Sequence, residues 1–472
     1  MAKRNLDSKA TRTNVCLEQS AIRRQDPDGL GKDDEGGGPD RISDLPDAVL
    51  GEIISLLPTK EGARTRILAS RWRNLWRSAP LNLDCYELTT TWGELAGVVS
   101  RILSSHQGPG RCFRIPCGFL PYEAATVDSW LQSPAIDNLQ ELRFSYPMLH
   151  NQSPLPLLPE SFLRFSTTLR VATIEHCHLL DSIVQGLQFP QLRQLTLSIV
   201  RISECSVPHV IAGCPALECL MIRDCFGFRR LGINSISLRS VGVHAECYRD
   251  ELNFGELIIE NAPCLEKLLH LGCTGDLHVS VIFAPKLETM RCCSNPTTKT
   301  SFGSMVIQGL RIDGLTTVVR TIKFLSVDMD KFCLDTIINL MRCFPCLEKL
   351  YIQSYLSGPK NLWLSKHKNF INGHDIRLKK IMFKLYRGTR SQVSFVTFFV
   401  LNARVLESMI LEIEHKNDNE EFLAEHRRKL QLENRASRGA RFQFTTDKCV
   451  RNVWDINDAR VLDLADPFAC LC

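Results

Sequence analysis

A short apolar frame recurs along most of the chain, and it constrains the fold more than any other feature. The frame reads L-x-x-L-x-L, with conservative replacements at some inner positions, and proline often precedes it. Apolar residues at alternate positions place one face of a short β-strand in a core. Successive frames begin 21 to 32 residues apart. They start at Leu139, Leu169, Leu192, Leu217, Leu238, Leu265, Leu287, Val319, Leu347, Leu378 and Leu406.

This spacing is typical of leucine-rich repeats, in which each unit adds one strand to a continuous sheet. A single unit cannot bury its own apolar face, so neighbouring units must stack to form a core. We therefore expect an α/β fold in which residues 81–365 form a curved leucine-rich-repeat solenoid with irregular repeats of 21–32 residues.

The position eight residues after each frame start tests this interpretation, because leucine-rich repeats place Asn or Cys in the turn below the strand. Cys177, Cys225, Cys273 and Asn295 occupy this position, whereas other frames have different residues there. The number of repeats therefore stays open by one or two at either end. The chain has 20 cysteines, which we expect to be reduced thiols that pack as small hydrophobic side chains.

Residues 41–80 lack the leucine frame, and their sequence pattern predicts three short helices. Pro58 ends the first helix, and Thr59 and Ser70 are candidate N-caps of the second and third. The first helix, from about Asp47 to Leu57, has apolar residues at a helical period. So small a unit cannot bury all of its apolar side chains, and part of this surface should face a partner. These side chains are Val49, Leu50, Ile53, Ile54, Leu56, Leu57, Ile67, Leu68, Trp72, Leu75 and Trp76.

Motifs in this unit resemble the F-box. They are Leu45-Pro46-Asp47, the stripe Leu50/Ile53/Leu57, and the closing Ser70-Arg71-Trp72-Arg73-Asn74-Leu75-Trp76. The rest of the chain resembles plant proteins that join an F-box to leucine-rich repeats and a C-terminal FBD-type region. Cys214-Pro215-Ala216-Leu217-Glu218 and Phe344-Pro345-Cys346-Leu347-Glu348 are similar to the repeat starts of that group. Tyr386-Arg387-Gly388, through Phe398-Phe399-Val400-Leu401-Asn402-Ala403, is similar to its C-terminal signature.

The resemblance implies a trihelical F-box that docks on the adaptor subunit of an SCF-type ubiquitin ligase, which links it to cullin and RING subunits. Gly62 departs from the family pattern, and a helical glycine costs about 1 kcal/mol relative to alanine. Which implied residues touch the adaptor and which fill the core of the F-box stays open. The implied adaptor-binding residues are Leu45, Pro46, Leu50, Ile53, Leu57, Ile67, Leu68, Trp72 and Trp76.

The function that follows is that of a non-catalytic substrate-recognition subunit, with the repeats binding a target protein whose identity and binding residues are unknown. Contacts with the target should fall on the concave strand face, on residues such as Glu218, Cys219, Met221 and Arg223. One alternative is a leucine-rich-repeat scaffold that binds proteins without delivering them for ubiquitination, with residues 41–80 serving only to cap the solenoid. An unrecognised hydrolase is a third alternative.

Composition and motifs argue against several other classes. The 57 basic and 52 acidic residues give a net charge of only +5, which is not typical of a nucleic-acid binder. The longest apolar run, Val393 to Leu401, is far shorter than the roughly 20 residues that cross a membrane. The common phosphate-loop, zinc-protease and hydrolase motifs are absent from the sequence. Cys343-x-x-Cys346 has no second pair at zinc-finger spacing, so we expect no metal and no cofactor.

The remaining segments complete the predicted organisation. Residues 1–40 contain scattered charges and a glycine-rich tract, and they predict a disordered tail without a secretory signal. We therefore expect a cytoplasmic and/or nuclear protein. Residues 366–445 are predicted to be an FBD-like region that closes the solenoid, with a charged helix over 418–437 and a strand at 441–444. Residues 446–472 remain as a C-terminal segment.

Overall fold

The computed structural model describes most of the 472 residues and divides the chain into two compact units, Met1–Pro46 and Asp47–Cys472. In the first unit Leu45 is half-buried and Pro46 is exposed. The predicted disordered tail and Cys273 lie outside the described residues. The described residues are 42, 44–88, 92–115, 124–146, 155–245, 252–272, 276–313, 318–331, 333–356, 376–446 and 456–468.

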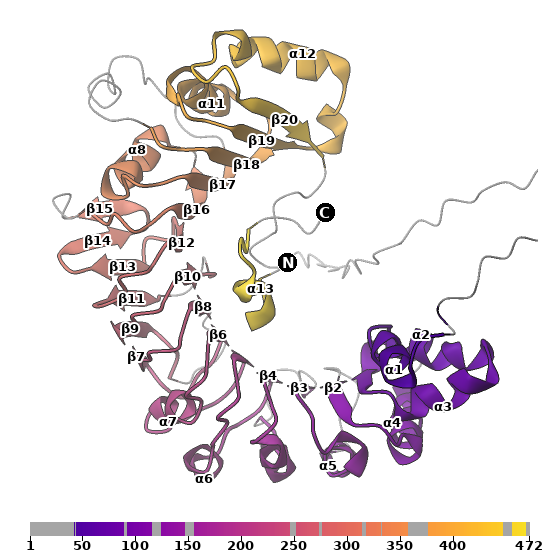
Figure 1. Cartoon of the computed structure of the whole chain (residues 1–472). Coiled ribbons are helices and arrows are strands. Elements are labelled where there is room, and N and C mark those ends of the chain that lie inside the picture. Colours follow the sequence, from indigo (N-terminus) through magenta and orange to yellow (C-terminus); the bar gives the residue numbers. More distant parts are fainter. Residues whose placement is uncertain are drawn as a thin grey trace, which may run out of the picture. The chain divides into compact units, whose positions relative to one another are not determined.

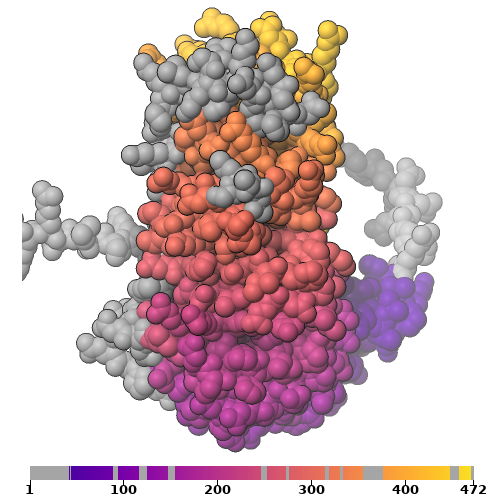
Figure 2. Space-filling view, turned by 90° about the vertical axis from the view of Figure 1, so that its left-hand side faces the viewer, coloured from indigo at the N-terminus to yellow at the C-terminus, as the bar shows by residue number. Residues whose placement is uncertain are grey.

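The second unit is built on a sheet of 14 parallel strands, in the order β1-β2-β3-β4-β5-β6-β8-β10-β12-β16-β17-β18-β19-β20. The strands lie side by side along an arc (Figure 1). Figure 2 shows the successive repeats as consecutive bands on the surface. The strands are β1 Leu81–Asp84, β2 Gly110–Arg114, β3 Glu141–Ser145, β4 Val171–Glu175, β5 Gln194–Ser198, β6 Cys219–Arg223, β8 Ser240–His244, β10 Lys267–His270, β12 Thr289–Cys293, β16 Phe324–Lys331, β17 Lys349–Leu356, β18 Lys380–Tyr386, β19 Ser408–Ile413 and β20 Arg441–Thr445.

The leucine frame explains why most of these strands form where they do. Each correctly predicted strand begins two residues after its frame start, and the frame residues are buried, as Leu217, Leu220 and Ile222 are in β6. Alternate residues therefore point into one core, while the residues between them face the inside of the arc. The predicted fold class is confirmed, with three short helices followed by a long parallel sheet of repeats.

One predicted frame is wrong. The frame that begins at Val319 lies three residues too early, because Phe324 of β16 pairs with Thr289 of β12 and Lys349 of β17. The true frame residues are Ile322, Leu325 and Val327, all of them buried. The spacing Val319-x-x-Ile322-x-Phe324 satisfies the same pattern, so the pattern alone cannot choose between the two registers.

Four repeats have a left-handed residue seven positions after the frame start, directly after the strand in β4, β5 and β6 and at the next-to-last residue of β18. His176, Ile199, Asp224 and Leu385 have φ values of 57°, 52°, 49° and 59°. This conformation costs about 1 kcal/mol for a residue with a Cβ atom, so the surrounding packing must stabilise the turn. In all four of these repeats the next residue, which is the predicted Asn or Cys position, is buried: Cys177, Val200, Cys225 and Tyr386. Burial raises the pKa of the Cys225 thiol to about 12, so this cysteine packs as a neutral side chain.

Helices and a second sheet cover the outer side of the arc (Figure 1). The helices are α4 Trp92–Ser105, α5 Ala124–Leu131, α6 Asp181–Gln185, α7 Val207–Ala212, α8 Leu334–Cys343 and α11 Arg390–Asn402, with 3-10 turns η2 Cys85–Glu87, η3 Pro134–Ile136 and η4 Glu160–Phe165. The second sheet has six strands, which the leucine frame does not predict. They are β7 Arg230–Asn234, β9 Glu256–Asn261, β11 His278–Val281, β13 Lys299–Phe302, β14 Met305–Gln308 and β15 Arg311–Asp313.

The last repeats end in a helix and a strand, close to the positions expected. The predicted charged helix is α12 Glu420–Lys429, which is followed by the 3-10 turn η6 Leu432–Asn434. Asn419 caps α12 by accepting the N–H of Phe422 at 2.9 Å, and Leu430 is buried beneath the helix end. The predicted strand at 441–444 is β20, the final strand of the long sheet. Within the described ranges, no helix is long and apolar enough to cross a bilayer.

Candidate functional site

The three predicted helices before the first strand are present, and their inner faces form a small core. They are α1 Asp47–Ser55, α2 Thr59–Arg64, which continues into the 3-10 turn η1 Thr65–Ile67, and α3 Ser70–Ser78. The predicted N-caps are wrong, because Pro58 and Ala69 hold those positions without a side-chain bond. The core side chains are Leu50, Ile54, Trp72, Leu75 and Trp76, all of them buried.

Gly62, which departs from the family pattern, lies in this core. It is buried in α2, and a Cβ atom there would lie 3.4 Å from the indole ring of Trp76 and 3.4 Å from the carbonyl oxygen of Ile54. Any side chain larger than a methyl group would push α2 away from Trp76. The close packing of α2 against Trp76 therefore restricts this position to small residues.

The outer faces of the same helices expose large apolar side chains to solvent. Leu56 is 78% exposed, Ile67 is 85% exposed and Leu68 is 64% exposed. Exposed apolar groups in such numbers are typical of surfaces that bind other proteins. We define the F-box apolar set as Val49, Ile53, Leu56, Leu57, Ile67 and Leu68.

The structure divides the residues that the resemblance implied into two groups. Leu50, Trp72 and Trp76 are buried and support the helices from within. Ile53, Leu57, Ile67 and Leu68 are exposed. The sequence could not make this division, because Leu50/Ile54 and Val49/Ile53/Leu56 form neighbouring stripes on a single helix. Leu45 and Pro46 belong to the first unit, and their role stays a prediction.

A basic depression lies next to the exposed Ile67. Its volume is about 720 Å3, and the side chains of Lys60, Arg64, Arg66 and Arg73 line it together with apolar groups. Among the described residues, Arg64 is the one of these four that pairs with an acid, Glu61 of the same helix, at 2.6 Å. Positive charge beside an apolar surface favours an acidic partner, because it accelerates association and excludes basic proteins.

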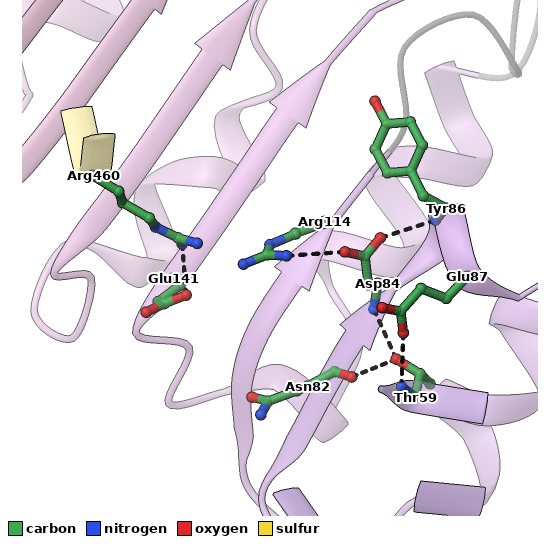
Figure 3. A network of polar contacts seen from close by, with 8 residues as sticks. All are labelled: Thr59, Asn82, Asp84, Tyr86, Glu87, Arg114, Glu141 and Arg460. Atoms are coloured by element: carbon green, nitrogen blue, oxygen red, sulfur yellow. Dashed lines mark hydrogen bonds and ion pairs between the residues drawn. The ribbon is translucent and has the colours of Figure 1, made fainter. Parts of the chain in front are cut away.

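Hydrogen bonds of Thr59 fasten α2 to the first strand of the long sheet and to the turn that follows it (Figure 3). The Thr59 hydroxyl donates to the Asn82 carbonyl oxygen at 2.6 Å and accepts the N–H of Asp84 at 3.0 Å. The Thr59 N–H donates to Glu87 at 2.9 Å. Asp84 in turn accepts from Arg114 of β2 at 3.0 Å. Thr59 thus acts as the joint between α2 and β1 and not as a helix cap.

Two further side chains from the first repeats strengthen this joint. Arg111 of β2 donates to Glu52 at 2.7 Å and to the Ser55 hydroxyl at 2.9 Å, both on α1. His106 follows α4; its Nε2 atom lies 2.9 Å from the Ala79 carbonyl oxygen, and its ring meets that of Trp76 edge-on with centroids 5.4 Å apart. Burial lowers the pKa of His106, which therefore donates as a neutral ring. The helices and the first repeats form one packed body.

Chemical groups that could hold a metal ion do not cluster in the described part of the chain, where no three His, Cys, Asp or Glu side chains come together suitably. In the sequence, the densest cluster of residue types that can bind metals is His176-Cys177-His178. It lies at a repeat turn, where Cys177 is buried. The F-box helices therefore offer an apolar docking surface, and the repeats offer a long strand face.

Three family models match separate parts of the chain. The family model for the F-box domain matches residues 42–84. The model described as "FBD-associated F-box protein At5g56370, LRR repeats" matches residues 127–352. The FBD model matches residues 375–411.

Similar proteins occur in Arabidopsis thaliana. The chain is 23% identical to the putative F-box/LRR-repeat protein At5g02930 over 427 residues, which cover 80% of this chain and 87% of that protein. It is 31% identical to the F-box/FBD/LRR-repeat protein At3g52680 over 238 residues, which cover 49% of this chain and 51% of that protein. It is also 31% identical to the F-box/FBD/LRR-repeat protein At5g56420, and that match covers 43% of this chain and 49% of that protein. The last two matches span about half the length of those relatives. With the family matches, the three helices and the parallel repeat sheet together, the chain belongs to the F-box/FBD/LRR-repeat proteins, which have homologues in the plant Arabidopsis thaliana.

Proposed function

We propose that this protein is the substrate-recognition subunit of an SCF-type cullin-RING ubiquitin ligase. The F-box binds the adaptor subunit, which links it to the cullin and RING subunits, and the repeats bind the target protein. The observation that carries this proposal is the F-box apolar set, since an isolated cap on a solenoid gains nothing from exposing Leu56, Ile67 and Leu68 to water. The chain itself holds and positions its partners and performs no bond chemistry.

The joint at Thr59 supports the second half of this role. A ligase subunit must hold its target at a fixed distance from the catalytic RING module, and a flexible connection would not do so. Hydrogen bonds of Thr59, Arg111 and His106 connect the F-box helices to the repeats. Movement of the target relative to the adaptor is therefore restricted by a packed and hydrogen-bonded connection.

Reconstitution tests the proposal. The full chain, mixed with purified adaptor, cullin and RING subunits at micromolar concentrations, should elute from a sizing column as one complex. The double variant Leu45→Ala/Pro46→Ala should remain folded and elute apart from them, because both residues belong to the implied docking surface. A wild-type chain that elutes apart from the adaptor would contradict the ligase function and favour a protein-binding scaffold.

A further inference from the structure

A segment near the end of the sequence lies on the inner face of the repeat sheet. Residues 456–468 include the short helix α13 (Ala459–Asp463), which contacts strands β5, β6 and β8. Figure 1 shows α13 inside the arc, on the side away from the outer helices. Two of the strand residues that the sequence predicted for target contacts, Cys219 and Met221, are buried beneath this segment.

The segment inserts apolar side chains between strand residues of several repeats. Ile456, Leu462 and Phe468 are buried in a cluster that also contains Leu269 and Tyr351. The rings of Phe468 and Tyr351 have centroids 5.1 Å apart. Gly242 of β8 leaves space for Met221 and Leu462, since a Cβ atom at Gly242 would lie 2.7 Å from the Met221 side chain and 3.3 Å from the Leu462 side chain.

Polar strand residues bind the main chain of the segment at both ends of α13. The Thr196 hydroxyl accepts the N–H of Ala459 at 2.9 Å. Lys267 donates to the carbonyl oxygens of Leu462, Asp463 and Leu464 at 3.3, 3.1 and 2.6 Å. Lys267 is buried, and such an ammonium group needs several oxygen partners to offset its lost hydration. Its position therefore suits the carbonyl end of a helical turn.

Charged side chains match across the same contact. Asp466 pairs with Lys349 at 3.2 Å and accepts a hydrogen bond from the Tyr351 hydroxyl. Asp463 accepts from Gln194 at 3.0 Å, and Asp458 accepts from Thr173 at 3.4 Å. Arg460 reaches Glu141 of β3 at 2.6 Å, as Figure 3 shows.

We infer that the strand face between β3 and β18 is a peptide-binding surface, and that residues 456–468 are its intramolecular occupant. The partner that it fits is an acidic peptide with one helical turn, an aliphatic side chain for the space at Gly242 and an aromatic side chain for Tyr351. Its aspartates replace Asp463 and Asp466, and its carbonyl oxygens replace those at Lys267. This inference deepens the proposed function and rests on it, since the bound peptide belongs to the target protein.

A peptide from another molecule must compete with the attached segment. An attached ligand acts at an effective concentration of about 1 mM when its linker is short and flexible. If the free peptide binds the vacated face with a Kd of about 10 μM, the intact chain should bind it about a hundredfold more weakly. Displacing the segment should therefore strengthen binding of the same peptide in trans.

Fluorescence anisotropy with a labelled synthetic peptide of residues 456–468 tests this inference on the full chain. The variant Leu462→Asp should bind the peptide at least tenfold more tightly than wild type, because an aspartate cannot occupy the apolar space at Gly242. The matched control Ala465→Asp adds the same charge at an exposed residue of the segment and should bind like wild type. Adding Lys267→Met to Leu462→Asp should abolish the gain.

A second segment variant, Phe468→Asp, repeats the measurement through an independent contact. The inference is overturned if both folded variants bind the peptide no better than wild type. It is also overturned if both variants fail to fold, since the segment would then be an obligatory part of the core. Adaptor binding is measured on the same samples: its failure with peptide binding intact contradicts the ligase function alone, and the reverse result contradicts this inference alone.

Discussion

At the scale of single residues, the motif Tyr386-Arg387-Gly388 illustrates how packing selects a residue type. The hydroxyl of the buried Tyr386 lies 2.9 Å from Nδ1 of His426, which comes from α12. Gly388 has a φ of 68°, and a Cβ atom there would lie 2.0 Å from the His426 ring. The motif that resembles the FBD signature therefore joins the end of β18 to α12, and only glycine fits at its third position.

Replacing Gly388 with alanine should destabilise the protein by more than about 2 kcal/mol, because a steric clash adds to the backbone strain. Gly303 provides the control: its φ is 58°, but a Cβ atom there meets nothing within 4 Å. Gly303→Ala should cost only about 1 kcal/mol. The free energy of unfolding in denaturant measures both, and equal losses would contradict the role given to His426.

Thr59→Val should cost about 1–3 kcal/mol, because it removes the hydroxyl that pairs with Asn82 and leaves the partly buried N–H of Asp84 without its acceptor. Thr65→Val is the matched control, since the Thr65 hydroxyl bonds only the Gly62 carbonyl oxygen in its own turn, at 2.7 Å. Its loss should stay below about 1 kcal/mol. Denaturant unfolding measures the free energy of unfolding of both variants. If Thr59→Val loses no more stability than Thr65→Val, the joint contributes little to the stability of the protein.

At the scale of elements, the sequence predicted what depends on local pattern. Strand β6 and its neighbouring strands lie where the leucine frame predicts them. The helix breaker Pro58 lies just after α1, as expected. The frame failed at Val319, where two registers satisfy the same pattern and only packing against β12 and β17 decides. It could not predict the second sheet, because those strands are selected by pairing between distant repeats.

The joint between α3 and the first repeats should depend on pH through His106. Burial lowers the pKa of this ring below its ordinary 6.5, so the folded protein favours the neutral form. Below pH 6.5 the unfolded chain takes up a proton that the folded chain does not, and stability is lost as the pH falls from there towards the lower folded pKa. His106→Gln retains a donor for the Ala79 carbonyl oxygen and should show a smaller loss between pH 7.5 and pH 5.

Free energies of unfolding measured at both pH values, for wild type and His106→Gln, check this prediction. Burial lowers the pKa of His426 as well, and that ring contributes a pH dependence of the same sign. His426 is present in both proteins, so the difference between their losses isolates His106. Identical losses would show that His106 does not sense pH at this joint.

At the scale of the whole molecule, the two surfaces differ in how far the sequence could predict them. The sequence identified every residue of the F-box apolar set as part of a small apolar unit. Only the structure shows that Ile67 and Leu68 are exposed whereas Trp72 and Trp76 are buried. The strand face was predicted as the target-binding surface, but its occupation by residues 456–468 was not. Its contacts join residues as far apart as Glu141 and Arg460, and no local pattern relates such positions.

Calorimetric titration of the adaptor subunit into the full chain tests the central claim most directly. Ile67→Asp and Leu68→Asp, made together, should weaken adaptor binding at least a hundredfold, which corresponds to about 2.7 kcal/mol. Ile236→Asp is the matched control, because Ile236 is 74% exposed but lies between β7 and β8, outside the F-box. It should bind the adaptor like wild type. Equal affinity of the Ile67→Asp/Leu68→Asp variant and wild type would contradict the claim that these exposed side chains form the docking surface.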